Sequence, residues 1–79
     1  MIKFKINNLE NTVALMDNLE DYHTIKNWLK ENFNITISIT EYAMITLNTK
    51  VKEMTKHKPM KFYLETNDKK YLELICEIL

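Results

Sequence analysis

Few residues in this chain have the chemistry of a nucleophile or a soft metal ligand. They are Cys76, His23 and His57. A catalytic cysteine needs a nearby base or cation that lowers its pKa, whereas Cys76 follows Glu73 and Lys69 around an expected helix, where nothing lowers it. The three residues also lack the short spacing of zinc-binding pairs. The sequence therefore predicts no catalytic cysteine, no metal site and no cofactor.

Two acidic pairs, Glu20 with Asp21 and Glu65 with Asp68, are the candidates for acid–base catalysis. Both pairs lie where we expect helices to begin. Acidic residues are common there because they interact favourably with the helix dipole. The only serine, Ser38, alternates with isoleucines in an expected strand, where a hydroxyl group needs no catalytic role. We interpret these residues as structural.

The chain contains no glycine and no arginine. Glycine forms the left-handed or closely approaching backbone of phosphate-binding loops, dinucleotide-binding turns and nucleophile elbows, so these enzyme classes are excluded. Arginine offers the planar, five-donor group that reads guanine and binds phosphate bidentately. The absence of glycine and arginine, together with the lack of a catalytic cysteine, serine or acidic pair, predicts that the protein is not an enzyme. No motif is specific enough to indicate a family.

All eleven cations are lysines, and eleven acidic residues balance them. A net charge of zero creates no long-range field that would attract nucleic acid or an anionic membrane. Residues 50–61 are nevertheless locally basic. Lysines there could bind phosphates without reading bases, although such a run is also typical of a solvated helix face. The candidate contacts with nucleic acid or an acidic partner are Lys50, Lys52, Lys56, His57, Lys58 and Lys61.

Hydrophobic periodicity predicts the elements that hold these residues. Residues 2–6 alternate isoleucine or phenylalanine with lysine and predict a strand. Residues 8–16 predict a helix capped by Asn8; the alternative is a strand over residues 12–16 that pairs back on the first. Asn18 is expected to cap the N-terminus of the clearest helix, and Asn34 its C-terminus.

Residues 35–39 alternate isoleucine with polar residues and predict another strand. For residues 40–56 we favour a helix entered through Thr40, because Met44, Leu47, Val51 and Met54 recur at helical spacing. The alternative is a β-hairpin that turns at Asn48 and Thr49, but no turn-forming residues separate it from the preceding strand.

Residues 61–66 predict a further strand, and a last helix is expected to follow, capped by Thr66 or Asn67. The apolar face of this helix is wide enough either to lie deep against a sheet or to meet a partner. The residues of this expected partner face are Tyr71, Leu74 and Ile78.

The elements predict one domain over residues 1–79, a small two-layer α/β (α+β) sandwich of about three strands and three or four helices in the order β-α-α-β-α-β-α. The expected core is Ile2, Phe4, Ile6, Ile25, Trp28, Leu29, Phe33, Ile37, Phe62, Leu64, Leu72 and Ile75. A single cysteine and the absence of a signal peptide or apolar span predict a cytoplasmic protein.

The function that these observations favour is a non-enzymatic protein-interaction module. Small size, neutral charge and an amino-acid composition like that of A+T-rich genomes suggest a phage or mobile-element protein that binds and inhibits or adapts a host macromolecule. A protein partner is expected, a homodimer is compatible with the near-zero net charge, and no membrane contact is expected. The alternative is a small DNA-binding regulator that uses the lysine-rich residues 50–61.

Overall fold

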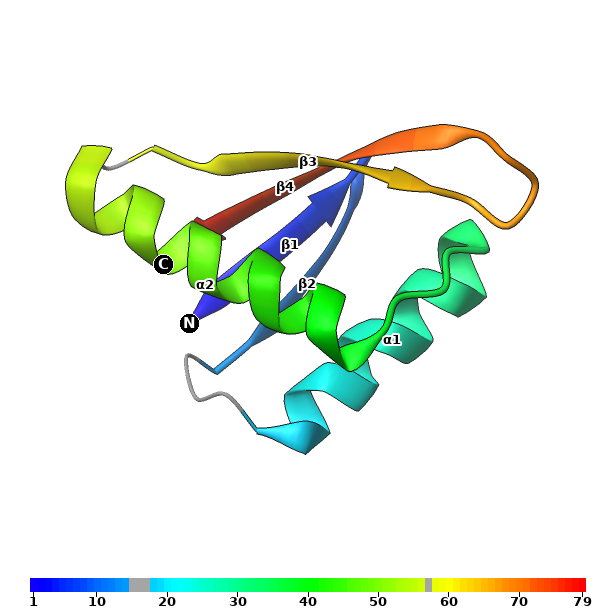
Figure 1. Cartoon of the computed structure of the whole chain (residues 1–79), viewed down its shortest axis with the longest axis horizontal. Coiled ribbons are helices and arrows are strands. Elements are labelled where there is room, and N and C mark those ends of the chain that lie inside the picture. The colour runs from blue at the N-terminus through cyan, green and yellow to red at the C-terminus, as the bar shows by residue number, and fades with distance from the viewer. Residues whose placement is uncertain (15–17, 57) are drawn as a thin grey trace.

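The computed structural model describes residues 1–14, 18–56 and 58–79, except for the side chains of residues 53, 55 and 56. Within these residues, two helices cover one face of a four-stranded antiparallel sheet with strand order β2-β1-β4-β3 (Figure 1). The mixed α/β class is therefore confirmed, with one more strand and fewer helices than predicted. The elements are β1 (Ile2–Ile6), β2 (Leu9–Val13), α1 (Leu19–Phe33), α2 (Ile39–Lys56), β3 (Met60–Glu65) and β4 (Tyr71–Ile78).

Strands β1 and β2 form a tight hairpin. The expected helix over residues 8–16 is wrong. The alternative, a strand that pairs back on β1, is confirmed in its pairing but not in its bounds, because the strand covers Leu9–Val13 and not residues 12–16, of which 15 and 16 lie outside the described chain. Ile6 pairs with Leu9, which leaves Asn7 and Asn8 as the turn. Asn7 has a φ of 54°, and asparagine tolerates this left-handed conformation better than other residues with a side chain.

Helix α1 has the two caps predicted from the sequence. The side chain of Asn18 accepts a hydrogen bond from the Asp21 backbone N–H at 2.7 Å. Asn34 adopts a left-handed conformation with φ 55°, and its backbone N–H donates to the carbonyls that end the helix. Ile25 and Leu29 are completely buried against the sheet, so α1 lies with its apolar side on the core.

Residues 34–38 connect α1 to α2 and do not form the predicted strand. Ile35 and Ile37 are buried while Thr36 and Ser38 are exposed, as in a half-buried strand, but the connection joins no strand of the sheet. The Tyr22 hydroxyl donates to the Ile37 carbonyl at 3.1 Å. The alternation of isoleucine with polar residues therefore reflects alternating burial here and not strand pairing.

Helix α2 confirms the predicted helix over residues 40–56, but its cap is Ser38 and not Thr40. The Glu41 backbone N–H donates to Ser38 Oγ at 3.1 Å, and the Ser38 backbone N–H donates to Glu41 Oε1 at 3.2 Å. These reciprocal bonds satisfy two backbone donors at the start of the helix.

The predicted last helix is wrong, since residues 71–78 form the long central strand β4 between β1 and β3. Its even-numbered residues face the helices and its odd-numbered residues face away, as the register with β1 requires. Thr66 and Asn67, expected as caps, lie after β3 and begin the turn into β4. In this turn the Thr66 backbone N–H donates to the Lys70 carbonyl at 2.6 Å, and Lys69 has a φ of 67°.

The core lies between the two helices and the sheet. Six of the predicted core residues are buried: Ile2, Phe4, Ile6, Ile25, Leu29 and Ile37. Five more are partly buried and pack against them: Trp28, Phe33, Phe62, Leu64 and Leu72. Ile75 is the exception, because it is an odd-numbered residue of β4 and points to the outer face of the sheet.

Candidate protein-binding surface

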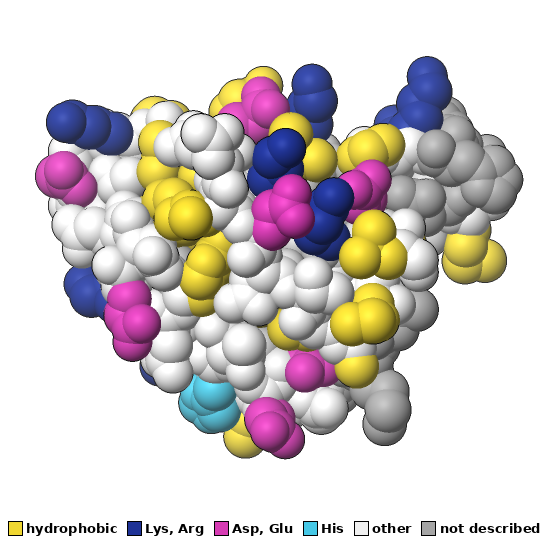
Figure 2. All heavy atoms as spheres, turned by 180° about the vertical axis from the view of Figure 1, so that it is seen from behind, with side chains coloured by type: hydrophobic (Ala, Val, Ile, Leu, Met, Phe, Trp, Pro, Cys, Tyr) yellow, Lys and Arg dark blue, Asp and Glu magenta, His cyan; other side chains and the backbone are white. Residues whose placement is uncertain are grey.

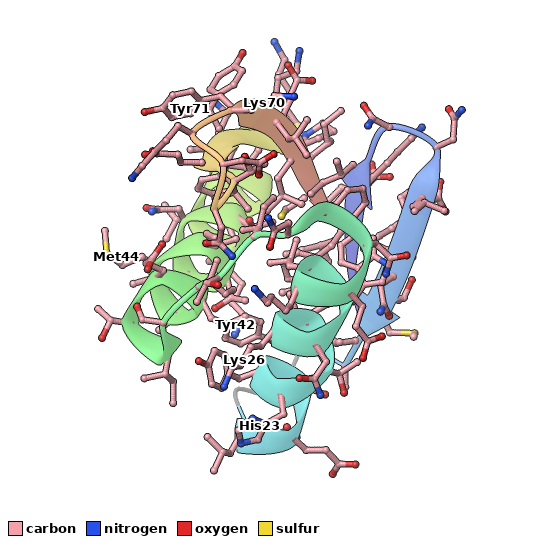
Figure 3. The ribbon with its side chains drawn as sticks, turned by 90° about the vertical axis from the view of Figure 1, so that its right-hand side faces the viewer. His23, Lys26, Tyr42, Met44, Lys70 and Tyr71 are labelled. Atoms are coloured by element: carbon pink, nitrogen blue, oxygen red, sulfur yellow. The ribbon has the colours of Figure 1, made fainter. Side chains whose placement is uncertain are left out.

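Helix α2 directs its most apolar side away from the sheet. Met44, which lies on this side, projects outward from the molecule, whereas Tyr42 points inward between the helices (Figure 3). Four large side chains are spaced by three, four and three residues, which places them in one line along the helix. This outer stripe of α2 consists of Met44, Leu47, Val51 and Met54, exposed by 58%, 61%, 52% and 80%.

The inner side of α2 is buried although it contains two threonines. The Thr49 hydroxyl donates to the Ile45 carbonyl at 2.7 Å, and the Thr46 hydroxyl donates to the carbonyls of Tyr42 and Ala43 at 3.1 Å. Each hydroxyl is thus satisfied by the helix itself, so neither threonine carries an unpaired polar group into the core. The inner side of α2 therefore packs on the core with few large apolar residues. The larger apolar side chains of the outer stripe stay exposed to water.

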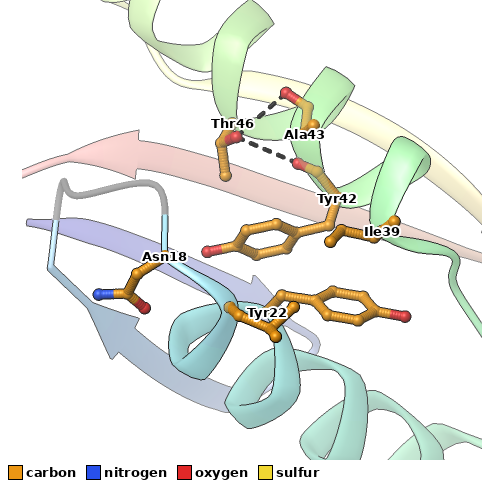
Figure 4. A pocket seen from close by; sticks show the side chains of 7 residues that line it. Asn18, Tyr22, Ile39, Tyr42, Ala43 and Thr46 are labelled. Carbon is orange, nitrogen blue, oxygen red and sulfur yellow. Dashed lines mark hydrogen bonds between the residues drawn. The ribbon is translucent and has the colours of Figure 1, made fainter.

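A pocket, which we call the tyrosine pocket, opens between the N-terminal halves of α1 and α2, beside the outer stripe. The rings of Tyr22 and Tyr42 form its wall, with centroids 5.7 Å apart (Figure 4). Its volume is about 250 Å³, and cavities of roughly 150 Å³ already admit a benzene ring, so one large apolar side chain fits. The remaining lining residues are Asn18, Leu19, Ile39, Ala43 and Thr46.

A second hollow lies on the opposite flank of α2, against the edge strand β3. It has a volume of about 270 Å³, and its apolar lining includes Met44, Ile45, Phe62 and Leu64. Met44 belongs both to this hollow and to the outer stripe. The stripe is therefore a ridge between two apolar depressions, a shape that complements the side chains of another helix.

The outer face of the sheet has a different character. Lys3 Nζ lies 2.7 Å from Glu77 Oε1 and 4.0 Å from Glu10 Oε1, and the hydrogen bond to Glu77 raises the pKa of Lys3. Figure 2, which views the molecule from behind, shows lysines and acidic side chains interspersed on this side. Such a mixed surface is typical of a solvated sheet face.

The structure does not gather the four lysines of residues 50–61 whose side chains it describes on one surface. Lys50 and Lys52 are partly buried and leave α2 on nearly opposite sides, because two residues turn the helix by about 200°. Lys61 pairs with Ile75 on the outer face of the sheet, whereas Lys58 is exposed after the helix. His57 and the Lys56 side chain lie outside the described residues.

The expected partner face at the C-terminus is divided by strand alternation. Tyr71 is exposed on the outer face of the sheet, where its hydroxyl lies 3.3 Å from Glu65 Oε2. Leu74 is completely buried under the helices, and Ile78 is partly buried on the same side. These residues would share a face on a helix but are separated on β4, so the structure does not bring them together on one surface.

The residues considered for catalysis do not assemble. Cys76, expected at the edge of a polar helix face, is buried in the centre of the sheet, and burial raises the pKa of its thiol to about 12. Asp68 has a lowered pKa, mainly because its carboxylate accepts a hydrogen bond from Thr66. Among the described residues, no group of three metal-binding side chains occurs, and neither described helix is long and apolar enough to cross a membrane.

Comparison of the chain with known protein families, curated proteins and solved structures finds no match. The outer stripe was visible in the sequence as helical periodicity, but its exposure was not. The same helix also carries a second stripe of Tyr42, Ile45, Thr46 and Thr49, and periodicity along the helix does not decide which of the two stripes faces the sheet.

Proposed function

We propose that this protein is a non-enzymatic protein-interaction module that binds the apolar side of a partner helix on the outer stripe of α2. The observation that supports this most strongly is the continuous exposure of Met44, Leu47, Val51 and Met54. Soluble monomers rarely leave contiguous apolar patches larger than a few hundred Å² in water, and such patches mark interaction sites.

A helix is the partner that best complements this surface. Spacings of three and four residues are those at which one helix packs its side chains between those of another. The hollows on both flanks of α2 could each take a side chain from such a partner, and anchors of this kind dominate binding energies. Leu19 and Ile39, each more than half exposed at the rim of the tyrosine pocket, extend the apolar surface toward α1.

The narrower hypothesis, a phage or mobile-element protein that inhibits or adapts a host macromolecule, rests on composition alone and stays a prediction. The DNA-binding alternative also stays a prediction. Its weakness is that Lys50, Lys52 and Lys61 point in different directions, whereas phosphate contacts that follow a nucleic-acid backbone need a common surface.

A photoreactive amino acid placed at Leu47 tests the proposal in cells that naturally produce the protein. We expect covalent adducts with a polypeptide, because the side chain would lie inside the interface. The matched control carries the same group at Glu73, which is exposed on the outer face of the sheet, and should give no discrete adduct. Adducts should also disappear when Val51→Lys is combined with the probe. Failure to obtain adducts at position 47, or equal adducts at both positions, would contradict the proposal.

A further inference from the structure

We infer that the helix bound by the outer stripe is α2 of a second copy of this chain, packed antiparallel to the first. The inference rests on the proposed function, because it names the partner of the same surface. It predicts a symmetric dimer with four layers, in which two sheets lie outside and two pairs of helices lie between them.

The stripe is complementary to itself. Its residues at positions 44, 47, 51 and 54 follow the alternating spacing of four and three residues that forms the contact line of two-helix coiled coils. A twofold axis across the centre of the stripe places Leu47 of one copy against Val51 of the other, and Met44 against Met54. Every exposed side chain of the stripe then meets an apolar counterpart of similar size.

The charges at the two ends of α2 favour the antiparallel arrangement over the parallel one. Glu41 lies in the first turn of α2, and Lys58 follows the end of the helix as an exposed residue. Antiparallel packing brings opposite charges and opposite ends of the helix dipoles together, whereas parallel packing would set like charges side by side. The zero net charge of the chain removes any general repulsion between two copies.

The tyrosine pocket gives the same arrangement a symmetric anchor. Met54 is the most exposed member of the stripe at 80% and lies near the C-terminal end of α2. In the antiparallel dimer it approaches the N-terminal half of the other helix, where the pocket opens beside Ala43. An unbranched methionine adapts readily to an irregular apolar hollow, so each copy would fill the pocket of the other.

Sedimentation velocity over a range of concentrations tests the dimer. We expect the wild-type protein to shift from monomer to dimer as its concentration rises. Leu47→Lys should weaken dimerisation by roughly 30-fold or more, because two lysines would be buried in each interface. The control Tyr63→Lys, on the exposed outer face of the sheet, should leave the dimer intact. Circular dichroism should show all three proteins folded; if Leu47→Lys is unfolded, Val51→Lys takes its place.

Disulfide trapping tests the orientation. Met44→Cys and Met54→Cys should cross-link when the two variants are mixed but not when either is oxidised alone, and the buried Cys76 should not react. Cross-links within each single variant would overturn the antiparallel arrangement. A wild-type protein that stays monomeric at every concentration would overturn the dimer itself. If photo-adducts at position 47 then have the mass of another protein, the proposed function survives, and if no adducts form both proposals fail.

Discussion

Leu47 and Thr49 stand two residues apart on α2, yet the leucine is 61% exposed and the threonine is completely buried. Thr49 can occupy the core because its hydroxyl bonds the Ile45 carbonyl within the same helix. Leu47 has no comparable packing site, since the sheet lies on the other side of the helix. This inversion of the usual order of burial is what makes α2 the candidate binding surface.

The orientation of α2 predicts unequal effects of two neighbouring truncations. Ile45→Ala should lower the free energy of unfolding by about 2–4 kcal/mol because it leaves a cavity under the helix. Leu47→Ala should change it by less than about 0.5 kcal/mol in dilute, monomeric protein. Urea denaturation followed by circular dichroism measures both values. A larger loss for Leu47 than for Ile45 would show that the helix is turned the other way.

Asn7 has a left-handed backbone conformation, so replacing it by alanine and by glycine should affect the stability of the protein differently. Asn7→Ala should destabilise the β1–β2 hairpin by about 1 kcal/mol, because a Cβ without a polar group is disfavoured at positive φ. Asn7→Gly should be neutral or stabilising. The neighbouring Asn8→Ala provides the control, since Asn8 is not among the positive-φ residues. Thermal unfolding distinguishes the three, and equal effects of alanine and glycine would contradict the turn geometry.

Burial of Cys76 predicts a thiol that alkylating reagents do not reach in the folded protein. Because its folded pKa is raised from 9.0 to about 12, the thiolate is scarce at neutral pH. The folded state keeps the thiol protonated, so this contribution to stability is complete below pH 9 and is lost as the pH rises toward 12. Iodoacetamide should modify Cys76 in urea but not in buffer at pH 8. Rapid modification without denaturant would contradict its placement.

The lowered pKa of Asp68 predicts a contribution to folding stability that is lost at acid pH. Hydrogen bonds from Thr66, from its own backbone and from Asn34 lower its pKa below 3.8. The ionised carboxylate therefore favours the folded state above that value, and this contribution disappears as the pH falls through the folded pKa. Asp68→Asn should lower the melting temperature at pH 7, and the difference from wild type should vanish in strong acid. A difference that persists unchanged at low pH would point to lost packing instead of charge.

The lysines of residues 50–61 predict only weak binding to nucleic acid. We expect the wild-type protein to bind random duplex DNA no more tightly than about 10⁻⁴ M at physiological salt, since few phosphates can be contacted at once. Fluorescence anisotropy with a labelled duplex measures this at several salt concentrations. Micromolar binding that falls steeply with salt, and is abolished by the combined reversal of Lys52, Lys56 and Lys58 to glutamate, would support the DNA-binding alternative.

The sequence predicted correctly those elements that depend on interactions between residues close together in the chain. The alternation of Ile2, Phe4 and Ile6 with lysines identified β1, and the asparagines at both ends of α1 identified its caps, because each signal depends on neighbours in the chain. Strand β4 was mistaken for a helix for the opposite reason. A central strand has apolar residues on both sides, as at Leu74 and Ile75, and this density also fits a broad helical face.

The sequence by itself favoured a helix over a β-hairpin for α2, because Met44, Leu47, Val51 and Met54 recur at helical spacing and no turn residues precede the segment. Only the tertiary structure decided which side of α2 faces the core. Two sides of the helix were available, one with Tyr42, Ile45 and the threonines and the other with the outer stripe. The aromatic ring of Tyr42 stacks on Phe4 of the central sheet, with centroids 6.2 Å apart, and the threonine hydroxyls bond their own helix. The outer stripe was left in water because burial depends on which surface the sheet presents, which no local pattern along α2 contains.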